Sequence, residues 1–228
     1  MVVRVKVKSK LAHFGTAFSN HTSKMSYRVP SKSSLRGFVG AALGISFDDC
    51  QELPYRYNFK WVTRTRTQMV AQSRMVIENT NSLHSVVRSA DWERGNLKRS
   101  IDYIEYVVGD DGYIEGDLLI EVLDGSEDRL VNHLRNPEFP LYLGSSECLV
   151  KVVDVRCIDI EWLDGTAEFS GMFVGEIDGF YLSERMPERM LSYRKPGKFE
   201  EVYLLENSIV GKSKCGYYVV DGENRSIY

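Results

Sequence analysis

The chain begins with a strand pattern followed by one glycine-rich helix pattern, and this pair restricts the fold to packed sheet and helix. Residues 2–8 read Val-Val-Arg-Val-Lys-Val-Lys, which predicts a half-buried strand with an apolar face and an entirely cationic outward face. Residues 33–43 have apolar side chains at helical spacing, with Pro30 and serines before them and Gly44 in position for a left-handed cap. The apolar face of this helix contains Leu35, Phe38, Val39, Ala42 and Leu43.

Two glycines inside this helix predict close packing. Gly37 and Gly40 each cost about 1 kcal/mol of helix propensity relative to alanine. We therefore expect the helix to approach a sheet closely at these positions.

The later patterns complete an α+β order. Residues 59–77 predict one long strand or a strand running into a projecting hairpin. Strands are expected at residues 103–108, 118–123 and 148–160, with a turn at 109–112 and a helix capped by Ser126-Glu127-Asp128 that buries Leu130, Val131 and Leu134. The order β, α, β, β, α, β is compatible with a ferredoxin-like unit. Beyond a boundary near residue 160, short strands at 169–177, 180–182, 201–205 and 216–220 predict a smaller β extension.

Charge is sorted along the chain. Residues 1–99 contain 17 Lys/Arg and 6 Asp/Glu, residues 100–228 contain 12 and 26, and the net charge is −3. A near-neutral total therefore hides a cationic half that could hold a polyanion and an anionic half that would repel one.

Two cationic stretches could bind phosphate. Arg28, Lys32 and Arg36 surround the serine-rich helix start, where unpaired N–H groups favour anions; the alternative is a solvated helix start with ordinary capping serines. In residues 60–68, Arg64 and Arg66 would share one strand face, opposite the threonine hydroxyls, which suits a sugar–phosphate backbone. The alternative is an edge strand protected by charge. The cationic run continues through Arg74, Arg88, Arg94, Lys98 and Arg99, and the nearby aromatics Phe59, Trp61 and Trp92 are more typical of core than of base stacking.

Few features indicate catalysis. His13 and His84 lie in the basic half and could act in metal-independent RNA cleavage, although a surface or hydrogen-bonded role is the better interpretation for each. The four cysteines are scattered singly, which favours reduced thiols and no metal site, and no cofactor motif is complete. The charged N-terminus and the lack of a long apolar run predict a cytoplasmic protein with no membrane partner.

Two stretches carry a family resemblance. Tyr27–Gly44, preceded by His13-Phe14, resembles the signature S-Y-x-V-P-P-x-S-x-L-x-G-x-x-G-A-x-L-G, with Ser31 in place of the second proline. Asn136–Glu147 resembles the segment P-x-Y-L-G-x-S-E. Both are typical of the CRISPR-associated Cas-five family of the RAMP superfamily, and the resemblance extends over the first two-thirds of the chain.

The resemblance implies a ferredoxin-like (RRM-like) RAMP domain at residues 1–160, a β-hairpin thumb within about 66–100, and a C-terminal β extension at 161–228. It implies a non-catalytic subunit of a type I Cascade complex that grips the 5′ handle of crRNA and caps the backbone-subunit filament. Such a subunit docks the large PAM-reading subunit and meets target DNA only indirectly, while its acidic half faces protein partners. The residues then expected to contact RNA are His13, Tyr27, Arg28, Ser31, Lys32, Ser33, Ser34, Arg36, Gly37, Arg64, Arg66, Arg74, His84, Arg88 and Arg94.

Two other functions stay open. One branch of the family is itself a repeat-RNA endoribonuclease that uses Tyr, Lys and His, but the helix at residues 33–43 has no Tyr and the chain has no Lys-His pair. We therefore expect binding rather than catalysis, with a metal-independent endoribonuclease as the alternative and His13, His84 and Tyr27 as its candidates. A protein–protein adaptor with no RNA role is the third possibility.

Overall fold

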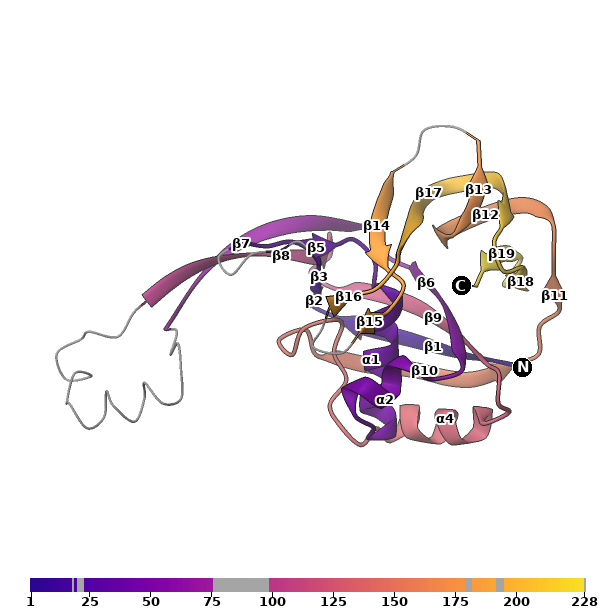
Figure 1. Cartoon of the computed structure of the whole chain (residues 1–228), viewed down its shortest axis with the longest axis horizontal. Helices are drawn as coiled ribbons and strands as arrows, with labels where there is room; N and C mark the ends of the chain where they lie inside the picture. Colours follow the sequence, from indigo (N-terminus) through magenta and orange to yellow (C-terminus); the bar gives the residue numbers. More distant parts are fainter. Residues whose placement is uncertain (18, 20–22, 76–98, 179–181, 192–194, 228) are drawn as a thin grey trace.

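A four-stranded antiparallel sheet forms the centre of the computed structural model, which describes residues 1–17, 19, 23–75, 99–178, 182–191 and 195–227. The sheet contains β1 (Val2–Ser9), β6 (Tyr55–Trp61), β9 (Ile114–Val122) and β10 (Val150–Ile158), in the order β10-β1-β9-β6. Figure 1 shows this sheet beside the helices α1 (Lys32–Leu43), α2 (Phe47–Gln51) and α4 (Glu127–Arg135). The fold is therefore a mixture of α and β made mostly of strands.

The predicted helices form with the predicted apolar faces. Ser31 caps α1 by accepting a hydrogen bond from the Ser34 amide, and Gly44 ends it at φ 71°. All five residues of the predicted α1 face are buried, as are the three apolar residues of α4. Ser126 occupies the N-cap position of α4, but its hydroxyl donates to Asp124 Oδ1 at 2.6 Å instead of capping the helix.

The glycines of α1 do not face a sheet, so that expectation was wrong. A Cβ atom at Gly40 would lie 2.6 Å from Cys50 Cβ, which shows that the close approach is to α2. A Cβ atom at Gly37 would meet nothing within 4 Å. No close packing contact therefore explains the loss of helix propensity at Gly37.

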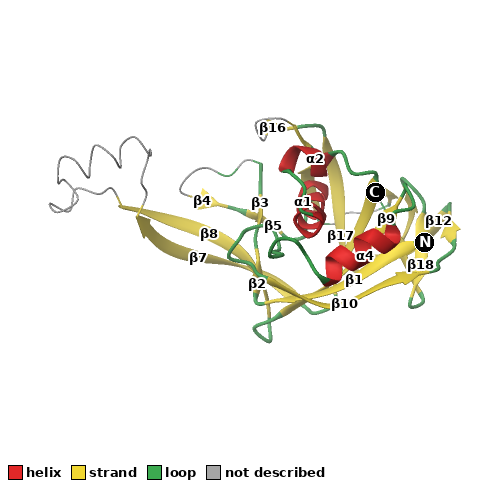
Figure 2. Cartoon of the chain, turned by 90° about the horizontal axis from the view of Figure 1, so that it is seen from below, coloured by secondary structure: helices red, strands yellow, loops and turns green. Residues whose placement is uncertain are grey.

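A long hairpin leaves the body of the molecule (Figures 1 and 2). β7 (Thr65–Met75) pairs with β8 (Arg99–Gly109) from Thr65–Gly109 to Met75–Arg99, so the β-rich stretch at 59–77 divides between β6 and this projection. The turn at 109–112 joins β8 to β9 as predicted, with the Gly112 amide donating to Gly109 O. Residues 76–98, where much of the predicted thumb falls, lie outside the described residues. At the hairpin base, β2 (Leu11–Ala12) and β4 (Ser23–Lys24) pair with β8, and β3 (Phe14–Gly15) pairs with β5 (Ser26–Tyr27).

The C-terminal strands form a second sheet that packs on the first. Its order is β11-β18-β19-β12-β17-β13, and β14 also pairs with β17. Its members are β11 (Trp162–Leu163), β12 (Thr166–Phe173), β13 (Gly175–Ile177), β14 (Ser183–Pro187), β17 (Phe199–Ser213), β18 (Tyr217–Val220) and β19 (Glu223–Ser226). β15 (Met190–Leu191) and β16 (Lys195–Pro196) form a separate pair. Met172, Val174, Met186 and Val202 join the same core as the first sheet, α1 and α4. The domain limits stay a prediction.

A buried charge network joins the two sheets. Asp117 of β9 accepts hydrogen bonds from Arg4 of β1 at 2.8 Å and from Arg225 of β19 at 3.3 Å. Arg225 is 2% exposed and also donates to Asn58 Oδ1 at 2.6 Å. The outward face of β1 was predicted to be cationic and solvated, but Arg4 is buried because the second sheet covers it.

None of the helices that the structure describes has the length and apolar composition needed to span a membrane.

Gly37→Ala and Gly40→Ala should change stability in opposite directions although they lie on one helix. Gly37→Ala should raise the free energy of unfolding by about 0.5–1 kcal/mol, because alanine favours the helix and has room. Gly40→Ala should lower it by about 1–3 kcal/mol, because the new methyl group pushes against Cys50. Urea unfolding measures both changes, and a gain for both variants would contradict the packing of α1 on α2.

Asp117→Asn should lower the free energy of unfolding by about 3–5 kcal/mol, because it leaves the buried Arg225 without a carboxylate. Asp221→Asn is the matched control: Asp221 also pairs with Arg4, at 2.7 Å, but its side chain is 68% exposed. The control should lose no more than about 1 kcal/mol. Equal losses in a thermal or urea unfolding series would show that the network does not join the sheets.

Candidate nucleic-acid interface

A groove of about 640 Å³ lies where the hairpin leaves the body. Its walls come from the end of β6, the connection 62–64, the start of β7, and residues of β12 and β17. The lining residues are Arg28, Val29, Phe59, Lys60, Trp61, Val62, Thr63, Arg64, Thr65, Arg66, Asp110, Gly171, Met172, Leu182, Leu204 and Leu205. The groove therefore joins one of the predicted cationic stretches to a wall that the C-terminal sheet supplies.

Arg64 and Arg66 lie on the outer side of this segment, and the threonines lie on the other. Both arginines are exposed, whereas Thr63, Thr65 and Thr67 are half-buried. Thr63 Oγ1 accepts a hydrogen bond from the Glu115 amide at 3.0 Å, which fixes the chain between β6 and β7. The predicted alternation of arginine and threonine faces is confirmed, although Arg64 precedes β7 rather than lying within it.

The groove cations differ in how far they are neutralised. Lys60 Nζ lies 2.5 Å from Glu223 Oε2, and Arg66 Nε lies 3.7 Å from Asp110 Oδ1, with both side chains of the second pair largely exposed. Arg28 is exposed, and its main-chain amide donates to the Glu184 carboxylate. Arg64 has no ion-pair partner among the residues that the structure describes. Arg28 likewise forms no ion pair among the described residues, but the Glu184 carboxylate lies at its main chain, so Arg64 is the groove cation best placed to meet an incoming anion.

The aromatic residues of the groove are held by the protein. Phe59 is 1% exposed and makes an edge contact with Trp61 at 4.6 Å between ring centroids. The Trp61 indole N–H donates to the Arg28 carbonyl at 2.8 Å. The interpretation of these residues as core fits Phe59 fully and Trp61 in part, while Trp92 lies outside the described residues.

The start of α1 is an internal junction and not an open phosphate site. Ser31 caps the helix, Ser33 donates to Gln51 Oε1 at 3.1 Å, and both serines are more than nine-tenths buried. The buried Lys32 lies 3.8 Å from Glu200 Oε2, and burial lowers the pKa of its ammonium group. A carboxylate of the second sheet thus occupies the position where an anion was predicted. Tyr27 is also buried and donates to the Arg185 carbonyl at 3.0 Å, and Ser34 is half-buried against Ser31.

His13 lies in the interior. It is 8% exposed, its Nδ1 is 2.7 Å from the Glu105 carbonyl oxygen, and its ring packs edge-on against Tyr106. This placement matches the hydrogen-bonded role that the sequence favoured over a catalytic one.

The other predicted contacts are divided among several places. Arg36 and Gly37 lie on α1, Arg36 in a separate pocket described below, and Arg74 is opposite Ser100 on the hairpin. His84, Arg88 and Arg94 lie outside the described residues. Of the predicted residues that the structure describes, only Arg28, Arg64 and Arg66 come together in the groove.

Much of the charge separated along the sequence is brought together in space. β9 belongs to the acidic half and pairs with β1 on one side and β6 on the other. Lys8 therefore lies 2.7 Å from Glu115, and Arg56 lies 3.3 Å from Glu121. Arg4, Lys32, Lys60 and Arg66 pair with carboxylates of the same half. The expectation of a cationic half was wrong for these residues, because strand pairing and the packing of the second sheet on the first place the two halves side by side.

The two stretches that resembled a known family also meet in space. The His13 amide donates to the Leu143 carbonyl, and the Glu138 amide donates to the Ala42 carbonyl at the end of α1. Gly144 has φ 88°, and a Cβ atom there would lie 1.8 Å from the His13 carbonyl oxygen. Both stretches thus fix the packing of the body beside the groove.

Sequence reasoning missed the wall formed by Gly171, Leu182, Leu204 and Leu205. No local pattern could have found it, since Gly171, Leu204 and Leu205 come together through the pairing of β12 with β17, and Leu182 joins them by accepting a hydrogen bond from the Leu204 amide. Among the described residues, no group of three or more His, Cys, Asp or Glu side chains could hold a metal ion.

Comparison with known proteins places the chain among CRISPR-associated proteins. The sequence profile of the family described as CRISPR-associated protein (Cas_Cas5) matches residues 2–168. A structure described as a CRISPR RNA-guided surveillance complex matches with 10% identity and a TM-score of 0.57, over 93% of this chain and 91% of that chain. The crystal structure of a CRISPR protein from Archaeoglobus fulgidus matches with 16% identity and a TM-score of 0.57, over 100% of this chain and 99% of that chain. At these identities the likeness shows the fold alone. No curated protein matches the chain.

Proposed function

The chain belongs to the CRISPR-associated Cas5 family, and from this we propose that it is a guide-RNA-binding subunit of a type I surveillance complex. In this role it grips the 5′ handle of the crRNA, caps the filament of backbone subunits and docks the large subunit that reads the PAM. The observation that carries the RNA-binding role is the groove at the hairpin base, where the exposed Arg64 has no ion-pair partner among the described residues.

We infer that the body is a ferredoxin-like domain and that the projecting β7–β8 hairpin is its thumb. The support is the chain order β1, α1, β6, β9, α4, β10 together with the sheet order β10-β1-β9-β6. This arrangement puts the end of β6 at the hairpin base, where the sheet, the hairpin and the C-terminal strands all contribute side chains to one groove.

The groove suits a sugar–phosphate backbone better than a set of bases. Arg64 and Arg66 present guanidinium groups two residues apart on one side of the chain, and arginine binds phosphate oxygens in a bidentate manner. Phe59 is buried and the Trp61 indole N–H already donates to a carbonyl, so these rings are fixed by protein contacts. Affinity would then depend on a few phosphate contacts and would fall steeply with salt.

Lys60 can contribute only by exchanging its partner. Its ammonium group is bonded to Glu223 and also donates to Ser170 Oγ at 3.2 Å. A phosphate entering the groove would compete with that carboxylate, which lowers the net gain. Arg64 faces no such competition, so we expect it to contribute more to RNA affinity than Lys60.

We propose a binding role without cleavage. His13 is buried, its Nδ1 is engaged by a backbone carbonyl, and it does not line the groove, so the ring is not placed to accept a proton from a ribose hydroxyl there. The metal-independent endoribonuclease remains the alternative to be tested.

Arg64→Ala should weaken binding of a repeat-derived single-stranded RNA and should lower the slope of log affinity against log salt by about 0.7, the share of one phosphate contact. Arg66→Ala should have a smaller effect, because Arg66 already lies near Asp110. Arg64→Glu should prevent co-purification of full-length guide RNA with the protein.

Arg156→Ala is the matched control, since Arg156 is half-exposed on β10 and lies outside the groove. Fluorescence anisotropy at several salt concentrations measures all of these variants. A slope for Arg64→Ala equal to that of the control would place the RNA elsewhere on the protein.

Purified protein incubated with repeat RNA in EDTA should leave the RNA intact. If cleavage occurs and is lost in His84→Ala or His13→Ala, the chain is a metal-independent nuclease and the proposed binding-only role is wrong. His133→Ala, on α4, is the control variant, because α4 contributes no residue to the groove.

A further inference from the structure

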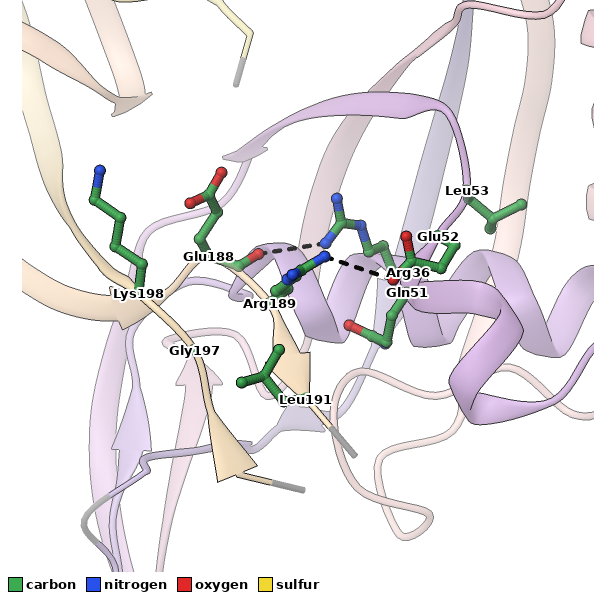
Figure 3. A pocket seen from close by; sticks show the side chains of 9 residues that line it. All are labelled: Arg36, Gln51, Glu52, Leu53, Glu188, Arg189, Leu191, Gly197 and Lys198. Atoms are coloured by element: carbon green, nitrogen blue, oxygen red, sulfur yellow. Dashed lines mark hydrogen bonds and ion pairs between the residues drawn. The ribbon is translucent and has the colours of Figure 1, made fainter. Parts of the chain in front are cut away.

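A second pocket, of about 430 Å³, lies between α1, the end of α2 and the β15–β16 pair (Figure 3). Its charged lining residues are Arg36, Glu52, Glu188, Arg189 and Lys198, and Gln51, Leu53, Leu191 and Gly197 complete it. It shares no lining residue with the groove at the hairpin base. The inference drawn from it therefore does not depend on the proposed RNA role.

Arg36 in this pocket is poorly satisfied for a half-buried guanidinium. Its Nη1 donates to the Glu188 carbonyl at 3.4 Å, which is beyond the usual range of an N–H···O bond, and its Nε is buried without a hydrogen-bond partner. Within the described part of the chain, no carboxylate lies at ion-pair distance from Arg36. The fully buried Arg4 and Arg225, by contrast, each bond to Asp117.

A second arginine, Arg189, faces the same space. Arg189 directly follows the residue whose carbonyl Arg36 contacts, and its only ion pair among the described residues is with Glu52 at 3.6 Å. Both side chains of that pair are more than half exposed, so it neutralises Arg189 weakly. Figure 3 shows the Arg36 and Arg189 side chains close to each other, Arg36 bonded to Glu188 and Arg189 to Glu52, while Lys198 is exposed at the pocket edge and points away from them. Cations brought together in this way are stabilised by an anion between them.

The lining selects the kind of anion. Among the residues that the structure describes, no aromatic side chain lines the pocket, so these residues offer a nucleobase no stacking surface. Glu52 and Glu188 at the wall would repel the closely spaced phosphates of a nucleic acid, whereas a single carboxylate can lie between the guanidinium groups. Leu53 and the exposed Leu191 offer apolar contact to the stem of an acidic side chain or to its neighbour.

We propose that this pocket binds an acidic side chain of a partner polypeptide, with Arg36 as the central donor and Arg189 as the second. Arginine forms strong bidentate bonds with carboxylates, and arginine is enriched at protein–protein interfaces. Such a contact would satisfy the Arg36 guanidinium, which has no anionic partner among the side chains that the structure describes.

The test uses the full chain labelled with ¹⁵N and the acetylated, amidated peptide Leu-Glu-Glu-Leu. The peptide should shift the Nε–H resonances of Arg36 and Arg189 in a saturable manner, and Leu-Gln-Gln-Leu should not. Arg36→Gln should weaken binding by about tenfold or more, followed through the Gln51 side-chain amide, because a hydrogen bond to a charged group is lost. Arg189→Gln should also weaken binding of the peptide. Because Arg189 is exposed, this variant tests the pocket even if Arg36→Gln fails to fold. Arg156→Gln, outside the pocket, should bind the peptide as the parent protein does.

Three results would overturn the proposal. The first is no saturable shift, and the second is equal binding of the glutamine peptide or of both pocket variants. The third is inorganic phosphate or a single-stranded RNA shifting the Arg36 resonance at lower concentration than the peptide, which would assign the pocket to nucleic acid.

Discussion

The structure depends on one buried carboxylate. Asp117 of β9 lies between Arg4 of β1 and Arg225 of β19, so one buried anion pairs with two buried cations from distant parts of the chain, and the exposed Asp221 adds a second partner for Arg4. Asn58 adds hydrogen bonds to the Met172 and Ser226 carbonyls and completes a polar layer between the two sheets. If either sheet slipped by one residue, a buried charge would lose its partner, so this layer admits a single register. The shape of the groove at the hairpin base depends on that register, because the walls of the groove come from both sheets.

The features predicted correctly from the sequence are those that neighbouring residues determine. The apolar face of α1, its cap at Ser31, its left-handed end at Gly44 and the turn at 109–112 all follow from neighbouring residues, and all are found. The alternation of Arg64 and Arg66 with threonines was equally local. The element against which Gly40 packs could not be predicted, since α2 is a five-residue helix whose approach to α1 depends on the folded chain.

Contacts between residues far apart in the chain determine the charge distribution that could not be predicted from the sequence. Charge sorted by half suggested a cationic lobe, yet β9 brings Glu115 and Glu121 beside Lys8 and Arg56. Glu200 arrives from a strand more than 160 residues away to lie beside Lys32, so the start of α1 has an internal anion. Among the described residues, the cations available to bind ligands are those with no carboxylate at ion-pair distance. Arg64 at the hairpin base and Arg36 in the second pocket are the clearest examples.

The shared core has a consequence for how the chain can be divided. The family match ends at residue 168, but Met172, Val174, Met186 and Val202 fill the core of the first sheet, and Arg225 compensates Asp117. A fragment cut at the end of the match would expose that apolar surface and would remove Arg225, one of the two buried partners of Asp117. The stretch that the family profile matches is thus shorter than the part of the chain that shares one core, so we expect a fragment ending at residue 168 to be less stable than the full chain.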